Sequence, residues 1–174
     1  GLDNGRDENV LVRTLLDVNS GYGHACVAAV KGDADRYSVI SAVSFMKELG
    51  HQKMRIRCDA EPAAQAFIAA VARESGKQVI EEQPPRGSHA SIGAVEAWHN
   101  EIQGTIRAML FELKEKLNFT PKIGHGLIAW CVRHACWALN RFHVMKNGFT
   151  PYHHVREVNY TRKVLSLGER CLWL

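Results

Sequence analysis

The order of apolar segments along the chain constrains its fold more than any other feature. Two β-prone stretches, residues 10–16 and 22–30, flank the turn-forming run Asp-Val-Asn-Ser-Gly and predict a β-hairpin. Helical and strand patterns then alternate as far as residue 82, and two long helices follow. A hairpin followed by crossover helices is typical of an α/β fold with a mixed sheet.

Glycine and proline residues mark where the expected elements begin and end. Gly50 and Gly76 terminate helices, and Pro62 suits the first turn of a helix. After the hairpin we expect a helix over residues 33–49, a strand over 54–58, a helix over 63–75, a strand over 78–82, a loop over 84–91, long helices over 93–117 and 124–146, and a short helix that begins at Thr150-Pro151.

The composition fits one globular domain. The 174 residues are 46% hydrophobic and 23% charged, and no apolar run approaches the ~20 residues that span a membrane. Five scattered cysteines without a Cys-x-x-Cys pair indicate a reduced, intracellular protein. The net charge of +4 permits a nucleic-acid partner without requiring one. We expect residues 1–174 to be a single-domain fragment of a longer polypeptide, because the first residues are polar and the last resemble the start of a strand.

Two acidic residues stand out by their positions. Asp59 lies at the C-terminal end of a strand expected to be buried, and Glu96 lies in the first turn of the first long helix. Glu96 also begins a polar ridge, because it falls within about 60° of Asn100, Gln103 and Arg107 around the helix axis. Such a ridge could follow a phosphate backbone. Position alone favours a structural alternative, in which Asp59 caps a helix and Glu96 interacts with the helix dipole.

Two segments around these acids resemble motifs of the retroviral-type integrase catalytic core. Residues 55–63 (Arg-Ile-Arg-Cys-Asp-Ala-Glu-Pro-Ala) resemble the strand that ends in that family's second catalytic aspartate. Residues 91–100 (Ser-Ile-Gly-Ala-Val-Glu-Ala-Trp-His-Asn) resemble its Asn-Gly-x-x-Glu-Arg-x-Asn signature. Asp59 and Glu96 are separated by 36 residues, in agreement with the family pattern.

Two further segments strengthen the resemblance, which extends from about residue 10 to about residue 160. Residues 16–22 (Leu-Asp-Val-Asn-Ser-Gly-Tyr) are similar to the second-strand motif that ends in Ser/Thr-Gly-Tyr. Residues 133–152 are similar to the segment that follows the core helix in retrotransposon polyproteins. The four segments occur in the family's order.

The resemblance implies an RNase H-like fold, with a mixed five-stranded sheet flanked by helices. In that fold three antiparallel strands precede the first helix, whereas only two precede residue 33 here. Residues 10–16 and 22–30 therefore correspond to strands two and three, and the first strand is expected to be truncated.

The resemblance also implies a function as the catalytic core of a retroelement integrase that acts in the nucleus. Its reaction is metal-dependent polynucleotidyl transfer, in which water trims the 3′ end of the element and that 3′-OH then joins target DNA. Asp59 would bridge two Mg²⁺ or Mn²⁺ ions and Glu96 would hold one, since hard cations prefer oxygen ligands. Expected DNA contacts come from Arg86, Ser88 and His89 in the loop and from Asn100, Gln103 and Arg107 on the helix.

The family needs a third carboxylate, in the middle of strand one. Asp3 is the candidate within this chain, because it precedes Ser20 by 17 residues, a separation that suits the family. The Asn4-Gly5 pair that follows Asp3 is typical of a turn and not of a strand. The alternative is an aspartate upstream of this chain, in which case the fragment alone is inactive. Asp17 is interpreted as a hairpin residue.

Two other functions stay open. An RNase H-type nuclease would use the same fold and metals with a glutamate from the first helix, for which Glu48 is the candidate. A decayed or domesticated element would bind DNA or a partner without cutting. The resemblance implies self-association as a dimer, with the helices at 33–49 and 93–117 as the leading candidate interfaces. Trp98 and the helix near Trp137 offer further apolar area.

The remaining histidines, cysteines and tryptophans are expected to be structural. The spacing of the histidines and cysteines between residues 125 and 136 lacks the paired pattern of zinc ligands; these residues are His125, Cys131, His134 and Cys136. Trp98, Trp130 and Trp137 are interpreted as core residues instead of base-stacking platforms.

Overall fold

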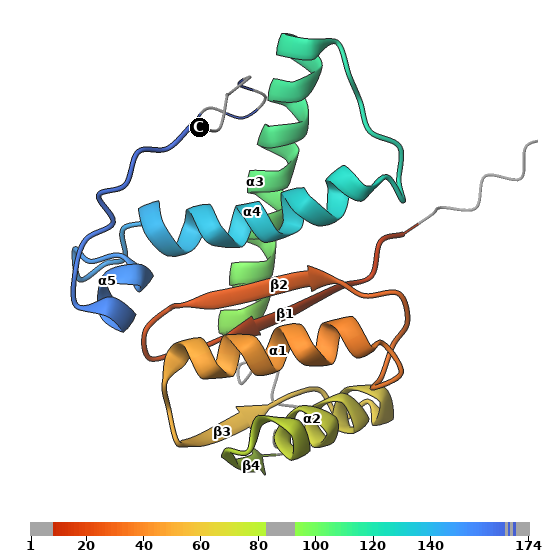
Figure 1. Cartoon of the computed structure of the whole chain (residues 1–174), viewed down its shortest axis with the longest axis vertical. Coiled ribbons are helices and arrows are strands. Elements are labelled where there is room, and N and C mark those ends of the chain that lie inside the picture. The colour runs from red at the N-terminus through yellow and green to blue at the C-terminus, as the bar shows by residue number, and fades with distance from the viewer. Residues whose placement is uncertain (1–8, 83–92, 166, 168, 170–174) are drawn as a thin grey trace, which may run out of the picture.

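The computed structural model describes residues 9–82, 93–165, 167 and 169 of the chain (Figure 1). Its elements follow the order expected from the sequence: β1 (Val12–Leu16), β2 (Gly23–Val27), α1 (Arg36–Leu49), β3 (Lys53–Arg57), α2 (Pro62–Ser75), β4 (Gln78–Glu82), α3 (Gly93–Leu117), α4 (Gly126–Phe142) and α5 (Pro151–Arg156). The mixed α/β class is therefore confirmed. No described helix combines the length and the apolar character that crossing a membrane requires.

The strands form two separate two-stranded sheets instead of one five-stranded sheet. β1 and β2 are an antiparallel hairpin, and β3 and β4 are parallel strands connected through α2. The prediction of a single sheet is not confirmed, because no described strand pairs with the facing edges of β1 and β3. The first strand that the resemblance implies was expected at or before the N-terminus, where residues 1–8 lie outside the described residues.

The turn between β1 and β2 requires a glycine. The Gly21 N–H donates to the Asp17 carbonyl at 2.8 Å, and Gly21 has a φ of +69°, where residues with a Cβ are strained. A Cβ on Gly21 would also lie 2.5 Å from the sulfur of Met145. The Ser-Gly-Tyr segment thus packs against the chain that leads to α5.

The described residues form two apolar clusters, one beside the hairpin and one between α1 and α2. The hairpin packs against α3 and α4, which cross each other behind and above it in Figure 1. Ala25 on β2 and Ala135 on α4 are fully buried, and their small side chains let helix and strand approach closely. The second cluster joins α1 and α2 and includes Met54, Ile56 and Val79 from β3 and β4.

The two edges of the hairpin differ in what covers them. α4 covers the outer edge of β2, where the Asn140 amide accepts from the Gly23 N–H at 2.8 Å and donates to the Gly23 carbonyl at 2.7 Å. The opposite edge belongs to β1. The backbone groups of Leu11 and Asp17 form hydrogen bonds with the β2 side of the hairpin. Because alternate residues of an antiparallel strand direct their backbone groups to opposite sides, the N–H and C=O groups of Val12, Thr14 and Leu16 point away from β2. Those groups form an edge without a described partner strand.

Helix ends follow the expected capping rules, with one correction. Asp35 caps α1 by accepting from the backbone N–H groups of Tyr37 and Ser38, and Gly50 ends the helix in the left-handed conformation at φ 78°. The second long helix was expected to reach residue 146 but ends at Phe142. His143 is in extended conformation there, and its N–H donates to the carbonyl of Leu139.

Candidate functional site

An open groove of about 1100 Å³ separates the two sheets. Its walls are β1, β3 with the residues that follow it, and the first two turns of α3. Side chains from the α1/α2 cluster, among them Met46 and Phe67, form an apolar floor. The groove brings together acidic residues from several elements, as a binding or active site would.

Asp59 and Glu96 both line this groove. Asp59 follows the end of β3, Glu96 lies in the first turn of α3, and both are exposed. The capping alternative for Asp59 is wrong, because the N-cap of α2 is Glu61. Neither carboxylate has a hydrogen bond or ion pair with another described residue. The structure thus places two predicted metal ligands on one groove and leaves both carboxylates free.

A complete metal site is not formed by the described residues alone. No group of three or more histidine, cysteine, aspartate or glutamate side chains there is arranged to hold a metal ion. Asp59 and Glu96 offer carboxylate oxygens, the donors that Mg²⁺ prefers, and such a site needs further ligands. The expected third carboxylate, Asp3, lies outside the described residues.

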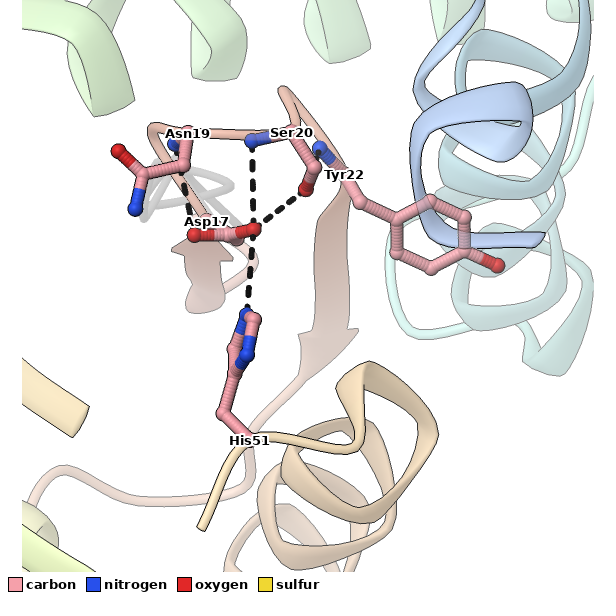
Figure 2. A network of polar contacts seen from close by, with 5 residues as sticks. All are labelled: Asp17, Asn19, Ser20, Tyr22 and His51. Atoms are coloured by element: carbon pink, nitrogen blue, oxygen red, sulfur yellow. Dashed lines mark hydrogen bonds and ion pairs between the residues drawn. The ribbon is translucent and has the colours of Figure 1, made fainter. Parts of the chain in front are cut away.

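Asp17 also lines the groove, but its carboxylate is occupied in shaping the hairpin turn (Figure 2). It accepts hydrogen bonds from the backbone N–H of Asn19 at 3.4 Å and of Ser20 at 3.3 Å, and from the Ser20 hydroxyl. His51, which precedes β3, places its Nε2 3.7 Å from the same carboxylate. The interpretation of Asp17 as a hairpin residue is therefore confirmed.

Glu48, the glutamate that a nuclease would need, has a structural environment. Its Oε1 accepts from the Tyr22 hydroxyl at 2.7 Å and from Arg156 at 3.2 Å, so it ties α1 to the hairpin and to α5. Burial, followed by the hydrogen bond to Glu48, raises the pKa of Tyr22 to about 12. Glu48 is not among the side chains that line the groove. The structure thus gives the nuclease alternative no support.

The polar ridge of α3 only partly reaches the groove. Asn100 lines it, whereas Gln103 and Arg107 are exposed farther along the helix. Gln103 hydrogen-bonds the ring of His99 at 2.9 Å, and His99 itself lines the groove. The loop candidates Arg86, Ser88 and His89 lie outside the described residues.

One set of charged groove residues was missed from the sequence. Lys53, Arg55 and Arg57 line the groove along β3, and all three are exposed. The signal was present as a basic residue at every second position of a strand, which places the three side chains on one face. Arg57 forms an ion pair with Glu82 on β4 at 2.7 Å.

The histidines and cysteines in and next to α4 have structural environments. Cys131 and Cys136 are buried, and burial raises the pKa of the Cys136 thiol to about 12. His134 instead stacks between Trp130 and Trp137, with ring centroids at 4.6 and 5.1 Å.

Among the tryptophans expected in the core, Trp98 is buried as predicted, where it packs over Gly23. The core prediction for Trp130 is wrong, because 45% of this side chain is exposed. Trp137 is half-buried and lies against Arg141, Phe142 and Tyr160.

No family model and no curated protein sequence matches the chain. Solved structures do. A chain of the simian T-cell lymphotropic virus intasome, in complex with PP2A regulatory subunit B56 gamma, matches 92% of this chain with a TM-score of 0.61 and 16% identity. This chain spans 51% of that one, about half its length.

Two catalytic core domains match over most of their own length. The HTLV-2 integrase catalytic core domain, in complex with magnesium in a dimeric form, has a TM-score of 0.55 and 14% identity over 84% of both chains. The catalytic core domain of BIV integrase has a TM-score of 0.55 and 16% identity over 85% of this chain and 86% of that one. The resemblance expected from the sequence is thus confirmed at the level of the fold: the chain folds like a retroviral integrase catalytic core.

Proposed function

We propose that the chain is the catalytic core of a retroelement integrase, within a longer polyprotein. Its reaction would be metal-dependent polynucleotidyl transfer: trimming of the element's 3′ ends, followed by joining of those ends to target DNA. The observation that carries the proposal is that Asp59 and Glu96, 37 positions apart in sequence, line one groove as exposed and unpaired carboxylates. The similarity in fold to the viral catalytic cores supports it.

Asp59 and Glu96 are the residues that would hold Mg²⁺ or Mn²⁺, two ions in all, with Asp59 shared between them. When bound, the ions would neutralise charge on the scissile phosphate and activate the attacking oxygen. The carboxylates suit this task because no ion pair competes for them in the described structure. Asn100, one turn beyond Glu96, would orient the DNA backbone by donating its amide N–H to a phosphate.

The open edge of β1 supports the proposed first strand. The groove separates β1 from β3, and the backbone groups of Val12, Thr14 and Leu16 face into the gap. A strand laid there would pair with β1 on one side and β3 on the other, and the two small sheets would become one sheet of five strands. Residues before Val12, or sequence upstream of Gly1, would supply it.

The direction of such a strand places its end near Asp59. The contact between Asp17 and His51 puts the end of β1 beside the beginning of β3, so Val12 lies toward the Asp59 end of the groove. A strand that enters β1 through a tight turn must therefore finish at that end. Asp3, or an aspartate upstream, would then be the third carboxylate beside Asp59.

The proposed partners are element and target DNA and a second copy of the chain, and the proposed location is the nucleus. For self-association, the structure favours α1 with α4 over α3. Tyr37 and Ile40 on α1 and Trp130 on α4 are each nearly half exposed, and Arg133 on α4 donates to the Tyr37 hydroxyl at 2.9 Å. The exposed apolar side chains of the two helices would be covered by the second copy.

The test is strand transfer of a labelled duplex with the element's terminal sequence into a plasmid, with Mg²⁺ or Mn²⁺, by the complete protein. Asp59→Asn and Glu96→Gln should each abolish both end trimming and joining. Glu115→Gln, an exposed glutamate at the far end of α3, should leave both intact. Cutting without joining in the unaltered protein would establish the nuclease alternative, and DNA binding without either reaction would establish the decayed element.

A metal titration tests the site without the reaction. Mg²⁺ should raise the melting temperature of the complete protein by mass action, and the rise should disappear in Asp59→Asn and persist in Glu115→Gln. An equal rise in all three proteins would show that the ion binds elsewhere.

A further inference from the structure

The strand β3 carries a row of basic side chains on one face. Lys53, Arg55 and Arg57 are exposed, whereas the alternate residues Met54 and Ile56 pack into the α1/α2 cluster. Successive members are about 6.6 Å apart, because each strand residue advances the chain by about 3.3 Å. We call Lys53, Arg55 and Arg57 the basic ladder.

Most of the charge of this ladder is not neutralised. Arg57 pairs with Glu82, its neighbour in the β3–β4 register, at 2.7 Å. Lys53 and Arg55 stand opposite Gln78 and Ile80, which carry no charge. Neither has a hydrogen bond or an ion pair with any other described residue through its side chain. Two adjacent unpaired cations on one strand repel each other, and an anionic partner would relieve that repulsion.

The ladder leads directly to the candidate catalytic carboxylates. It ends at Arg57, two residues before Asp59, and lines the groove that Glu96 and Asn100 line from α3. Its side chains point away from the α1/α2 cluster, and therefore toward the side of the sheets on which α3 lies. A linear polyanion along the ladder would bring one of its phosphates to Asp59.

We propose that the basic ladder binds the phosphodiester backbone of the DNA duplex whose phosphate is brought to Asp59 and Glu96. The proposal rests on the proposed function and adds a binding wall, β3, to the helix and loop contacts expected from the sequence. Arg55 suits a phosphate through paired N–H donors, and Lys53 suits it as a point charge. Such contacts are independent of base sequence and weaken with salt.

The experiment measures DNA affinity without catalysis. Binding of a fluorescent random-sequence duplex is followed by anisotropy in EDTA over a range of salt concentrations, using the complete protein. Lys53→Gln/Arg55→Gln should bind roughly tenfold more weakly at low salt, and its slope of log K against log salt should shrink by about 1–2. Lys114→Gln/Lys122→Gln removes the same charge from exposed positions that do not line the groove, and should change neither quantity as much.

A charge-preserving variant excludes a merely structural effect. Lys53→Arg/Arg55→Lys keeps both cations and should retain the affinity and the slope within about twofold of the unaltered protein. Equal binding by the Gln/Gln variant and the unaltered protein would overturn the proposal, and would leave the ladder as a charged surface that keeps an edge strand soluble.

Failure of the proposed function gives a different pattern. Asp59→Asn tests that function and should keep its DNA affinity in EDTA while losing strand transfer. Loss of affinity in the ladder variant, in a protein that never joins DNA, would establish the ladder without the enzyme. Intact affinity in the ladder variant, together with loss of joining in Asp59→Asn, would establish the enzyme without the ladder.

Discussion

Asn140 on α4 satisfies both backbone polar groups of Gly23 on β2, with one hydrogen bond of 2.8 Å and one of 2.7 Å. Asn140 is 4% exposed, so water cannot replace it. Asn140→Ala should therefore lower the free energy of unfolding by about 2–4 kcal/mol, since each buried group left without a partner costs about 1–3 kcal/mol. Urea denaturation measures the difference.

Asn147 provides the control for that prediction, because its side chain also makes two hydrogen bonds but is exposed. Asn147→Ala should cost about 1 kcal/mol or less, since water takes over its partners. Equal losses at the two positions would show that Asn140 is not needed to cover the β2 edge.

Replacement by alanine should have opposite effects on stability at Gly23 and at Gly104. A Cβ on Gly23 would lie 2.1 Å from the Trp98 ring, so Gly23→Ala should displace that ring and destabilise the protein by several kcal/mol, on the order of 2–4. A Cβ on Gly104, within α3, would meet only the end of Arg107 at 3.9 Å. Gly104→Ala should stabilise the protein by about 0.5–1 kcal/mol, because alanine favours a helix. Thermal and urea unfolding of both variants check the two signs.

We expect the buried, neutral ring of His24 to make the folded protein less stable in acid. Burial is the main cause that lowers the pKa of His24 from 6.5 to about 4, and the nearby Arg133 adds to it. The ring stacks on Phe45 and hydrogen-bonds Ser41 at 2.9 Å, so it is held neutral in the folded protein. Between pH 6.5 and about 4 the unfolded chain binds a proton that the folded chain does not, so unfolding becomes easier as the pH falls.

The free energy of unfolding should fall by roughly 3 kcal/mol at most. This loss is reached near pH 4 and is constant below it. Urea denaturation across this pH range should show the loss. The difference in the free energy of unfolding between the unaltered protein and His24→Gln should shrink by the same amount as the pH falls. A difference that does not depend on pH would mean that His24 titrates normally.

Trp130 and Phe111 distinguish the two helices that could mediate self-association. Trp130 on α4 is 45% exposed and lies one turn before Arg133, which hydrogen-bonds Tyr37 of α1. Phe111 on α3, by contrast, is 66% exposed. Trp130→Lys should convert a dimer to a monomer in sedimentation velocity, because a charge would be buried without a partner. Phe111→Lys should leave the dimer intact. The reverse result would favour α3, one of the two helices first expected from the sequence.

Local chemistry made most of the fold predictable. The turn at Asp17 and Gly21, the helix stops at Gly50 and Gly76, and the apolar stripe of α3 each follow from residue type and spacing alone. These features depend on neighbours within a few residues. Asp59 and Glu96, by contrast, were singled out by the resemblance, because position alone favoured a structural role for both.

What the sequence did not predict depends on contacts between distant segments. An apolar period cannot tell that Trp130 stacks on His134 at the surface while Trp98 is buried against Gly23. Whether the two sheets are separate depends on which strand pairs between β1 and β3. The local preference of residues for the strand conformation does not determine that pairing. The basic ladder was visible in the alternation at Lys53, Arg55 and Arg57, but its place on the groove required the position of α3.

The row of unpaired backbone groups at Val12, Thr14 and Leu16 also governs how the protein behaves in concentrated solution. An exposed strand edge accepts a strand from any neighbouring molecule, and it is a common starting point for edge-to-edge aggregation. Versions of the protein that begin close to Val12 should therefore precipitate or exchange strands more readily than versions with a longer N-terminal extension. Choosing where to start the polypeptide is thus a decision about solubility as well as about catalysis.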